Sequence, residues 1–82
     1  MKERIVKMLE ERVEELRESI KQENREIEYR EDRIKRVDNI REVKEQIHWV
    51  ETHQKEKGKT QARISELQTL KGIVERMSED EF

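Results

Sequence analysis

The chain has 82 residues, of which 49% are charged, and its 19 basic and 21 acidic residues leave a formal net charge of −2. This near balance argues against the strongly basic field that nucleic-acid-binding domains usually present. Because the chain has no cysteine, disulfides, thiolate nucleophiles and cysteine-ligated zinc are excluded. No apolar run is long enough for a membrane span or a signal peptide, so a cytoplasmic location is expected.

The composition predicts an all-α fold. Proline is absent, and the abundant glutamate, lysine and arginine are good helix formers. A chain of this length makes at most one small domain, whose own hydrophobic core rarely contributes more than about 3–5 kcal/mol to stability. A partner is therefore expected.

From the N-terminus, apolar residues recur at steps of three and four, the heptad pattern that is typical of a coiled-coil seam. Two charged residues, Glu23 and Arg30, interrupt the pattern. The predicted seam consists of Val6, Leu9, Val13, Leu16, Ile20, Ile27, Ile34, Val37, Ile40, Val43, Ile47 and Val50.

The seam changes phase after Val37, where three successive steps of three replace the alternation. In the same region Asn39 and Glu42 have the spacing of a capping box, which could begin a second helix. Because no glycine or proline marks the place, we expect one continuous helix over about residues 3–57, with a break near Asp38–Asn39 as the alternative.

The first expected stop is Gly58, which can adopt the left-handed conformation that ends helices, and Thr60 can cap a second helix. We therefore predict a turn at 58–59, a second helix over about residues 60–78 and a frayed tail at 79–82. The predicted core between the two helices consists of Trp49, Leu67, Leu70 and Val74.

These lengths predict a helical hairpin in an antiparallel coiled-coil homodimer. The first helix would be about 80 Å long and the second about 27 Å, so a second chain must cover the rest of the seam. Reading the seam inward from both ends pairs Val6 with Val50, with a two-fold axis near Glu28 and Tyr29. A parallel dimer would instead bury Glu23 against its own copy.

Two clusters of residues are candidate binding sites. Glu45 and His48 share one helix face at the i, i+3 spacing that di-iron bundles use, but the two copies in the dimer would lie far apart, so no metal or cofactor is predicted. The stretch that contains Gly58 is locally basic and could contact a phosphate backbone or an acidic partner. Its cations are Lys55, Lys57, Lys59 and Arg63.

The acidic stretch from Glu10 to Glu18 is interpreted as a solvated coiled-coil face that Arg41 and Lys44 of a second chain would neutralise, or else as a surface that recognises a basic target.

No catalytic motif is present, and the chain is predicted not to be an enzyme. Its predicted role is protein binding as a small homodimeric adaptor, regulator or inhibitor of an unidentified protein. The alternatives are nucleic-acid binding through the basic hairpin tip and, third, dimeric metal binding.

Overall fold

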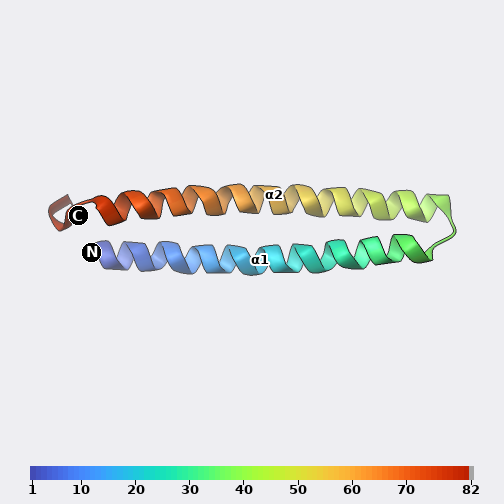
Figure 1. The fold of residues 1–82 in the computed structure, drawn as a ribbon, viewed down its shortest axis with the longest axis horizontal. Coiled ribbons are helices and arrows are strands. Elements are labelled where there is room, and N and C mark those ends of the chain that lie inside the picture. The colour runs from blue at the N-terminus through green and yellow to red at the C-terminus, as the bar shows by residue number, and fades with distance from the viewer. Residues whose placement is uncertain (82) are drawn as a thin grey trace.

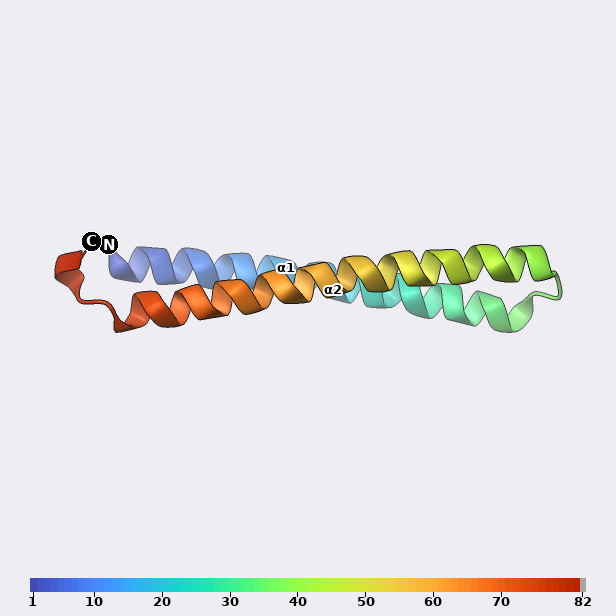
Figure 2. The same cartoon turned by 90° about the horizontal axis from the view of Figure 1, so that it is seen from above.

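The computed structural model describes residues 1–81 and consists of two long helices folded back on each other (Figure 1). Helix α1 spans Lys2–Arg36, helix α2 spans Ile40–Arg76, and a short 3-10 helix, η1, spans Glu79–Glu81. The helices lie side by side along their whole length, with both termini at one end (Figures 1 and 2). The predicted all-α helical hairpin is confirmed. In the described residues, no helix is long and apolar enough to cross a membrane.

The turn connects the helices at residues 37–39, and the predicted turn at 58–59 is wrong. Val37 is extended, with φ −98° and ψ 141°, and ends α1. Asn39 then caps α2, because its Oδ1 accepts hydrogen bonds from the backbone N–H of Arg41 at 2.8 Å and of Glu42 at 3.4 Å. No described residue has a positive φ, so this reversal needs no glycine. The phase change near Asp38–Asn39 marks the turn, and the predicted helix over 3–57 is two helices.

Gly58 lies inside α2, which continues without interruption from Ile40 to Arg76. A glycine in a helix interior costs about 1 kcal/mol relative to alanine. The packing of α2 against α1 along its length offsets that small cost, so Gly58 does not end the helix, and the predicted second helix over 60–78 is the C-terminal half of α2.

The core is the contact between the two helices. They have 35 and 37 residues, so α2 covers α1 from end to end. No second chain is needed to cover the seam residues of α1. Val13, Ile27 and Leu67 are the buried apolar residues of the core. The C-terminal end of the predicted seam is not covered within the chain, since Ile40 and Ile47 are 74% and 42% exposed, and its contact with a second chain stays a prediction.

The core predicted around the second helix is partly wrong. Leu67 is buried and Val74 is half-buried because both face α1, and they do not pack on Trp49, since all three residues belong to α2. Trp49 and Leu70 are instead 40% and 49% exposed. They lie at the margin of the interface, since the turn at 37–39 places a single helix opposite α2.

The two ends of the chain are held together by polar contacts. Lys2 Nζ donates a hydrogen bond to the Met77 carbonyl oxygen at 2.8 Å, and the Met1 ammonium lies 3.3 Å from a Glu79 carboxylate oxygen. Residues 79–81 of the tail predicted to fray form η1. The remainder of that prediction, residue 82, lies outside the described residues.

Replacing Gly58 with alanine tests the position of the turn. A Cβ at Gly58 would meet no atom within 4 Å, so we expect Gly58→Ala to raise the free energy of unfolding by about 0.5–1 kcal/mol. Urea denaturation followed by circular dichroism measures the change. Gly72→Ala, equally unobstructed, is the matched control. Destabilisation by Gly58→Ala alone would indicate a left-handed turn glycine.

Removing the cap of α2 should have the opposite effect. Asn39→Ala deletes the acceptor for two backbone N–H groups, and we expect a loss of about 1 kcal/mol in the free energy of unfolding. Asn39→Asp keeps an acceptor oxygen and should retain most of the stability in the same denaturation experiment. An unchanged free energy of unfolding in Asn39→Ala would show that the side-chain cap is unimportant.

Candidate functional site

The interface between the helices is polar toward the turn. His53 Nδ1 lies 2.6 Å from Glu23 Oε2, and Arg30 donates a hydrogen bond to the buried Gln46 side chain at 3.1 Å. The Nε of Arg30 is buried without a hydrogen-bond partner. Polar groups at seam positions reduce stability but favour one alignment of the helices. The two charged interruptions of the seam are thus matched by polar residues of α2.

The segment Glu45–His53, which holds both histidines and the tryptophan, is divided between the two sides of α2. His53 faces α1, whereas Glu45 and His48 are exposed. The described residues contain no group of three or more histidine, cysteine, aspartate or glutamate side chains that could hold a metal ion. Glu45 and His48 therefore have no further ligands gathered around them.

The predicted basic hairpin tip is wrong, because its four cations lie in the middle of α2, far from the turn. Lys57 is half-buried toward α1. Lys59 pairs with Glu56 at 3.3 Å and Arg63 with Glu66 at 3.4 Å, while Lys55 is exposed. The four side chains therefore do not converge on one anion site.

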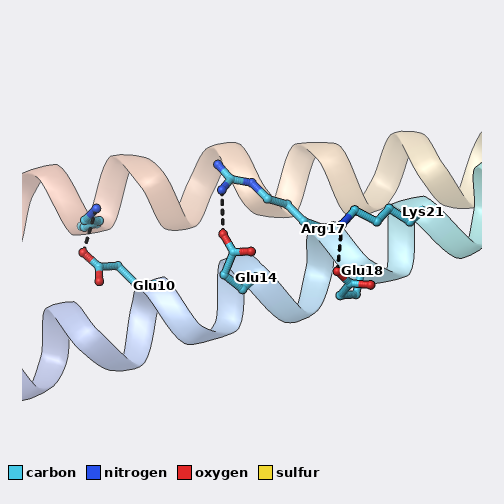
Figure 3. A network of polar contacts seen from close by, with 6 residues as sticks. Glu10, Glu14, Arg17, Glu18 and Lys21 are labelled. Carbon is cyan, nitrogen blue, oxygen red and sulfur yellow. Dashed lines mark hydrogen bonds and ion pairs between the residues drawn. The ribbon is translucent and has the colours of Figure 1, made fainter.

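Cations of the same chain accompany the acidic stretch of α1. Glu10 pairs with Lys71 of α2 at 3.0 Å, and Figure 3 shows this pair together with two pairs inside α1. Those are Glu14 with Arg17 at 2.8 Å and Glu18 with Lys21 at 3.0 Å. Arg41 and Lys44, which are expected to neutralise this stretch from a second chain, lie at the turn end of α2, and that contact between chains stays a prediction. Such exposed pairs contribute little to stability.

Large apolar side chains remain exposed along two lines that flank the interface. On α1, Met1, Met8 and Tyr29 are separated by multiples of seven residues and therefore lie along one line. On α2, Trp49 and Leu70 are separated by three heptads and lie along another. Met8 is 61% exposed and Tyr29 is 57% exposed.

Both lines lie on the same side of the hairpin. The Arg30 guanidinium carbon is 5.6 Å from the centre of the Tyr29 ring and 5.4 Å from the centre of the Trp49 ring. One guanidinium can contact both rings only if they flank it on one side, and both contacts lie within the range of cation–π attraction. We call this side the apolar face. It comprises Met1, Met8, Tyr29, Trp49, Leu70 and Ile73, all of which are exposed.

The opposite side is charged over much of its length. There, a shallow groove with Val13 at its base is lined by Glu10, Arg17, Gln68 and Lys71. Toward the termini a second groove is lined by Lys2, Lys7, Glu75 and other charged residues. Ile47 lies three heptads from Gln68 on the line of this side. Of the eight large apolar side chains that are exposed among the described residues, six therefore lie on the apolar face, whereas Ile40 and Ile47 lie on the opposite side.

The sequence reasoning missed the apolar face. It placed Trp49 and Leu70 in a core and assigned no role to Met8 or Ile73. The signal that could have found the face is the heptad spacing of Met1, Met8 and Tyr29. Met8 immediately precedes the seam residue Leu9, and Tyr29 immediately precedes Arg30, which interrupts the seam.

The sequence matches no protein-family model, and no curated protein and no solved structure shows significant similarity to it. The geometry of the hairpin is therefore the basis for its proposed function.

The polar pair in the interface generates a prediction about stability. Glu23→Leu alone leaves His53 without its acceptor and should lower the free energy of unfolding by about 1 kcal/mol, as should His53→Leu alone. The double variant replaces the pair by two apolar side chains and should be at least as stable as the wild type. Denaturation of the four proteins in a double-mutant cycle measures the coupling. Additive losses would show that the pair is not coupled.

Proposed function

We propose that this chain is a homodimeric helical-hairpin module that acts by protein–protein interaction, as an adaptor, regulator or inhibitor. The observation that supports this function is the apolar face. Single exposed apolar residues are ordinary on soluble proteins, but residues that gather on one side of a molecule mark an interaction surface. Here they gather in a chain of which 49% is charged.

The thin core of the hairpin also favours association. Among the described residues, only Val13, Ile27 and Leu67 are buried apolar residues, and no side chain is below 2% relative exposure. Two helices in one layer bury a single stripe each, whereas a second hairpin laid on the apolar face would create a four-helix core. A second copy would therefore supply burial that the single hairpin lacks.

The composition of the apolar face suits a protein partner. Tryptophan, tyrosine and methionine are enriched at the centres of protein interfaces. Trp49 is held between neighbours, because Arg30 lies over its ring and the His48 ring packs edge-on at 5.9 Å between centroids. A side chain that is already positioned loses less conformational entropy on binding.

This dimer differs from the one that the seam predicts. The seam of α1 is covered by α2 of the same chain, so the proposed contact between copies uses the apolar face instead. The charged side, with Glu10 and its neighbours, stays exposed in such a dimer. It is the surface through which a further protein partner would be bound.

The proposed function is tested by the oligomeric state and its dependence on Trp49. We expect sedimentation equilibrium to show a dimer, and Trp49→Ala to raise its dissociation constant at least about 30-fold, the effect of losing an interface hot spot of about 2 kcal/mol. Circular dichroism checks that the variant remains helical.

Ile47→Ala is the matched control, since Ile47 is 42% exposed, close to the 40% of Trp49, but lies on the charged side. Its dissociation constant should stay within about threefold of the wild type. A wild-type chain that remains monomeric at about 1 mM would contradict the proposal, because that concentration detects even weak association.

A further inference from the structure

The apolar face carries two clusters at different levels of the hairpin. Near the termini, the ion pair between Glu10 and Lys71 fixes the alignment of the helices, so Met8 lies at about the same level along the hairpin as Leu70 and Ile73. Near the turn, Arg30 joins Tyr29 to Trp49. The clusters are 21 residues apart on each helix, which corresponds to about 31 Å. We call them the end cluster and the turn cluster.

From this arrangement we infer that the second copy lies antiparallel on the apolar face, with the end cluster of each copy on the turn cluster of the other. The inference rests on the proposed function and adds the orientation and the contacts. A two-fold axis perpendicular to the helices, lying in the interface, stacks α1 on the partner's α1 and α2 on the partner's α2. Met8 then meets the partner's Tyr29, and Leu70 meets the partner's Trp49. Methionine and leucine side chains both pack well against aromatic rings.

One axis serves both helices. On α1, the midpoint between residues 8 and 29 falls between Glu18 and Ser19, and on α2 the midpoint between residues 49 and 70 falls between Lys59 and Thr60. The contacts between the helices show which residue of α2 lies opposite the α1 midpoint. Counting along both helices from the contact of Glu10 with Lys71 gives a position near residue 62. Counting from the contact of Glu23 with His53 gives a position near residue 58. The α2 midpoint lies between these two values.

Charges between the clusters are complementary about this axis. Arg12 and Glu26 lie seven residues on either side of Ser19, on the line of α1 between the seam and Tyr29. An axis beside Ser19 therefore brings Arg12 to the partner's Glu26, and Glu26 to the partner's Arg12. Ser19 itself is small enough to let the two α1 helices approach.

The same complementarity occurs on α2. Glu56 and Arg63 lie on the line of Trp49 and Leu70, at equal distances on either side of the midpoint. The axis brings Glu56 to the partner's Arg63. Opposite charges thus meet on both pairs of stacked helices, which favours this register over shifted ones.

The rival arrangement has its two-fold axis along the hairpin. It places the end cluster on the partner's end cluster and the turn cluster on the partner's turn cluster. It would bring two Arg30 guanidinium groups to the same level, although each already has a buried Nε without a partner. Two like charges converging in a desolvated cluster are unfavourable. The antiparallel arrangement separates the two Arg30 residues by about 34 Å, corresponding to 23 residues along the helices.

Cysteine cross-linking tests the inference, because the chain has no cysteine of its own. In the antiparallel dimer the two copies of residue 19 face each other across the axis, so Ser19→Cys should form a disulfide-linked dimer on oxidation. The product is read on a non-reducing denaturing gel. Arg17→Cys is the matched control, since residue 17 is at nearly the same level but lines the charged groove. We expect at least about tenfold less cross-linked dimer from it, because its α-carbons cannot approach within about 7 Å.

A mixture of Ser19→Cys and Lys59→Cys chains distinguishes the rival, in which residue 19 faces the partner's α2. Cross-linking in the mixture but not in Ser19→Cys alone would establish the rival arrangement, with its two-fold axis along the hairpin. That result would overturn the inferred orientation but leave the proposed dimer intact. A wild-type dimer without either cross-link would also overturn it. A monomeric wild-type chain in sedimentation would overturn the proposed function as well.

Discussion

The position of the reversal at residues 37–39 determines which surfaces of this chain are covered and which are free. A turn near the middle gives two helices of 35 and 37 residues, so that the apolar stripe of one covers that of the other along its whole length. A turn at Gly58 would leave most of the first stripe exposed. The contact between α1 and α2 thus replaces the contact between chains that the seam suggests. The surface that is left for a second copy is the apolar face, on the side of the hairpin.

The sequence predicts the helices and the seam of α1 well, because a heptad pattern is a repeated and specific signal. It does not decide between turns, because the local signals at Asn39 and Gly58 are of similar size, about 1 kcal/mol each. The deciding quantity is nonlocal: two helices of nearly equal length bury more apolar surface than a long helix and a short one. The phase change of the seam after Val37 is the sequence feature that coincides with the turn at 37–39.

The apolar face could not be predicted from either helix alone. Met8 and Tyr29 lie beside the seam of α1, and Trp49 lies beside the seam of α2, at positions that are ordinary flanks of a single helix. They come to lie on one side of the hairpin only when the helices are placed antiparallel with a particular alignment. A single tryptophan is usually a large part of a core, but a hairpin of two helices has no interior beyond its one interface.

The polar interruptions of the seam link this alignment to the proposed function. Glu23 contacts His53 and Arg30 contacts Gln46, and a slip of one heptad would break both contacts while leaving apolar residues opposite apolar residues elsewhere. The same slip would move Trp49 about 10 Å along α1, away from Tyr29. The residues that make the interface less apolar therefore specify the register, and that register places the two aromatic rings side by side on the face that we propose binds a second copy.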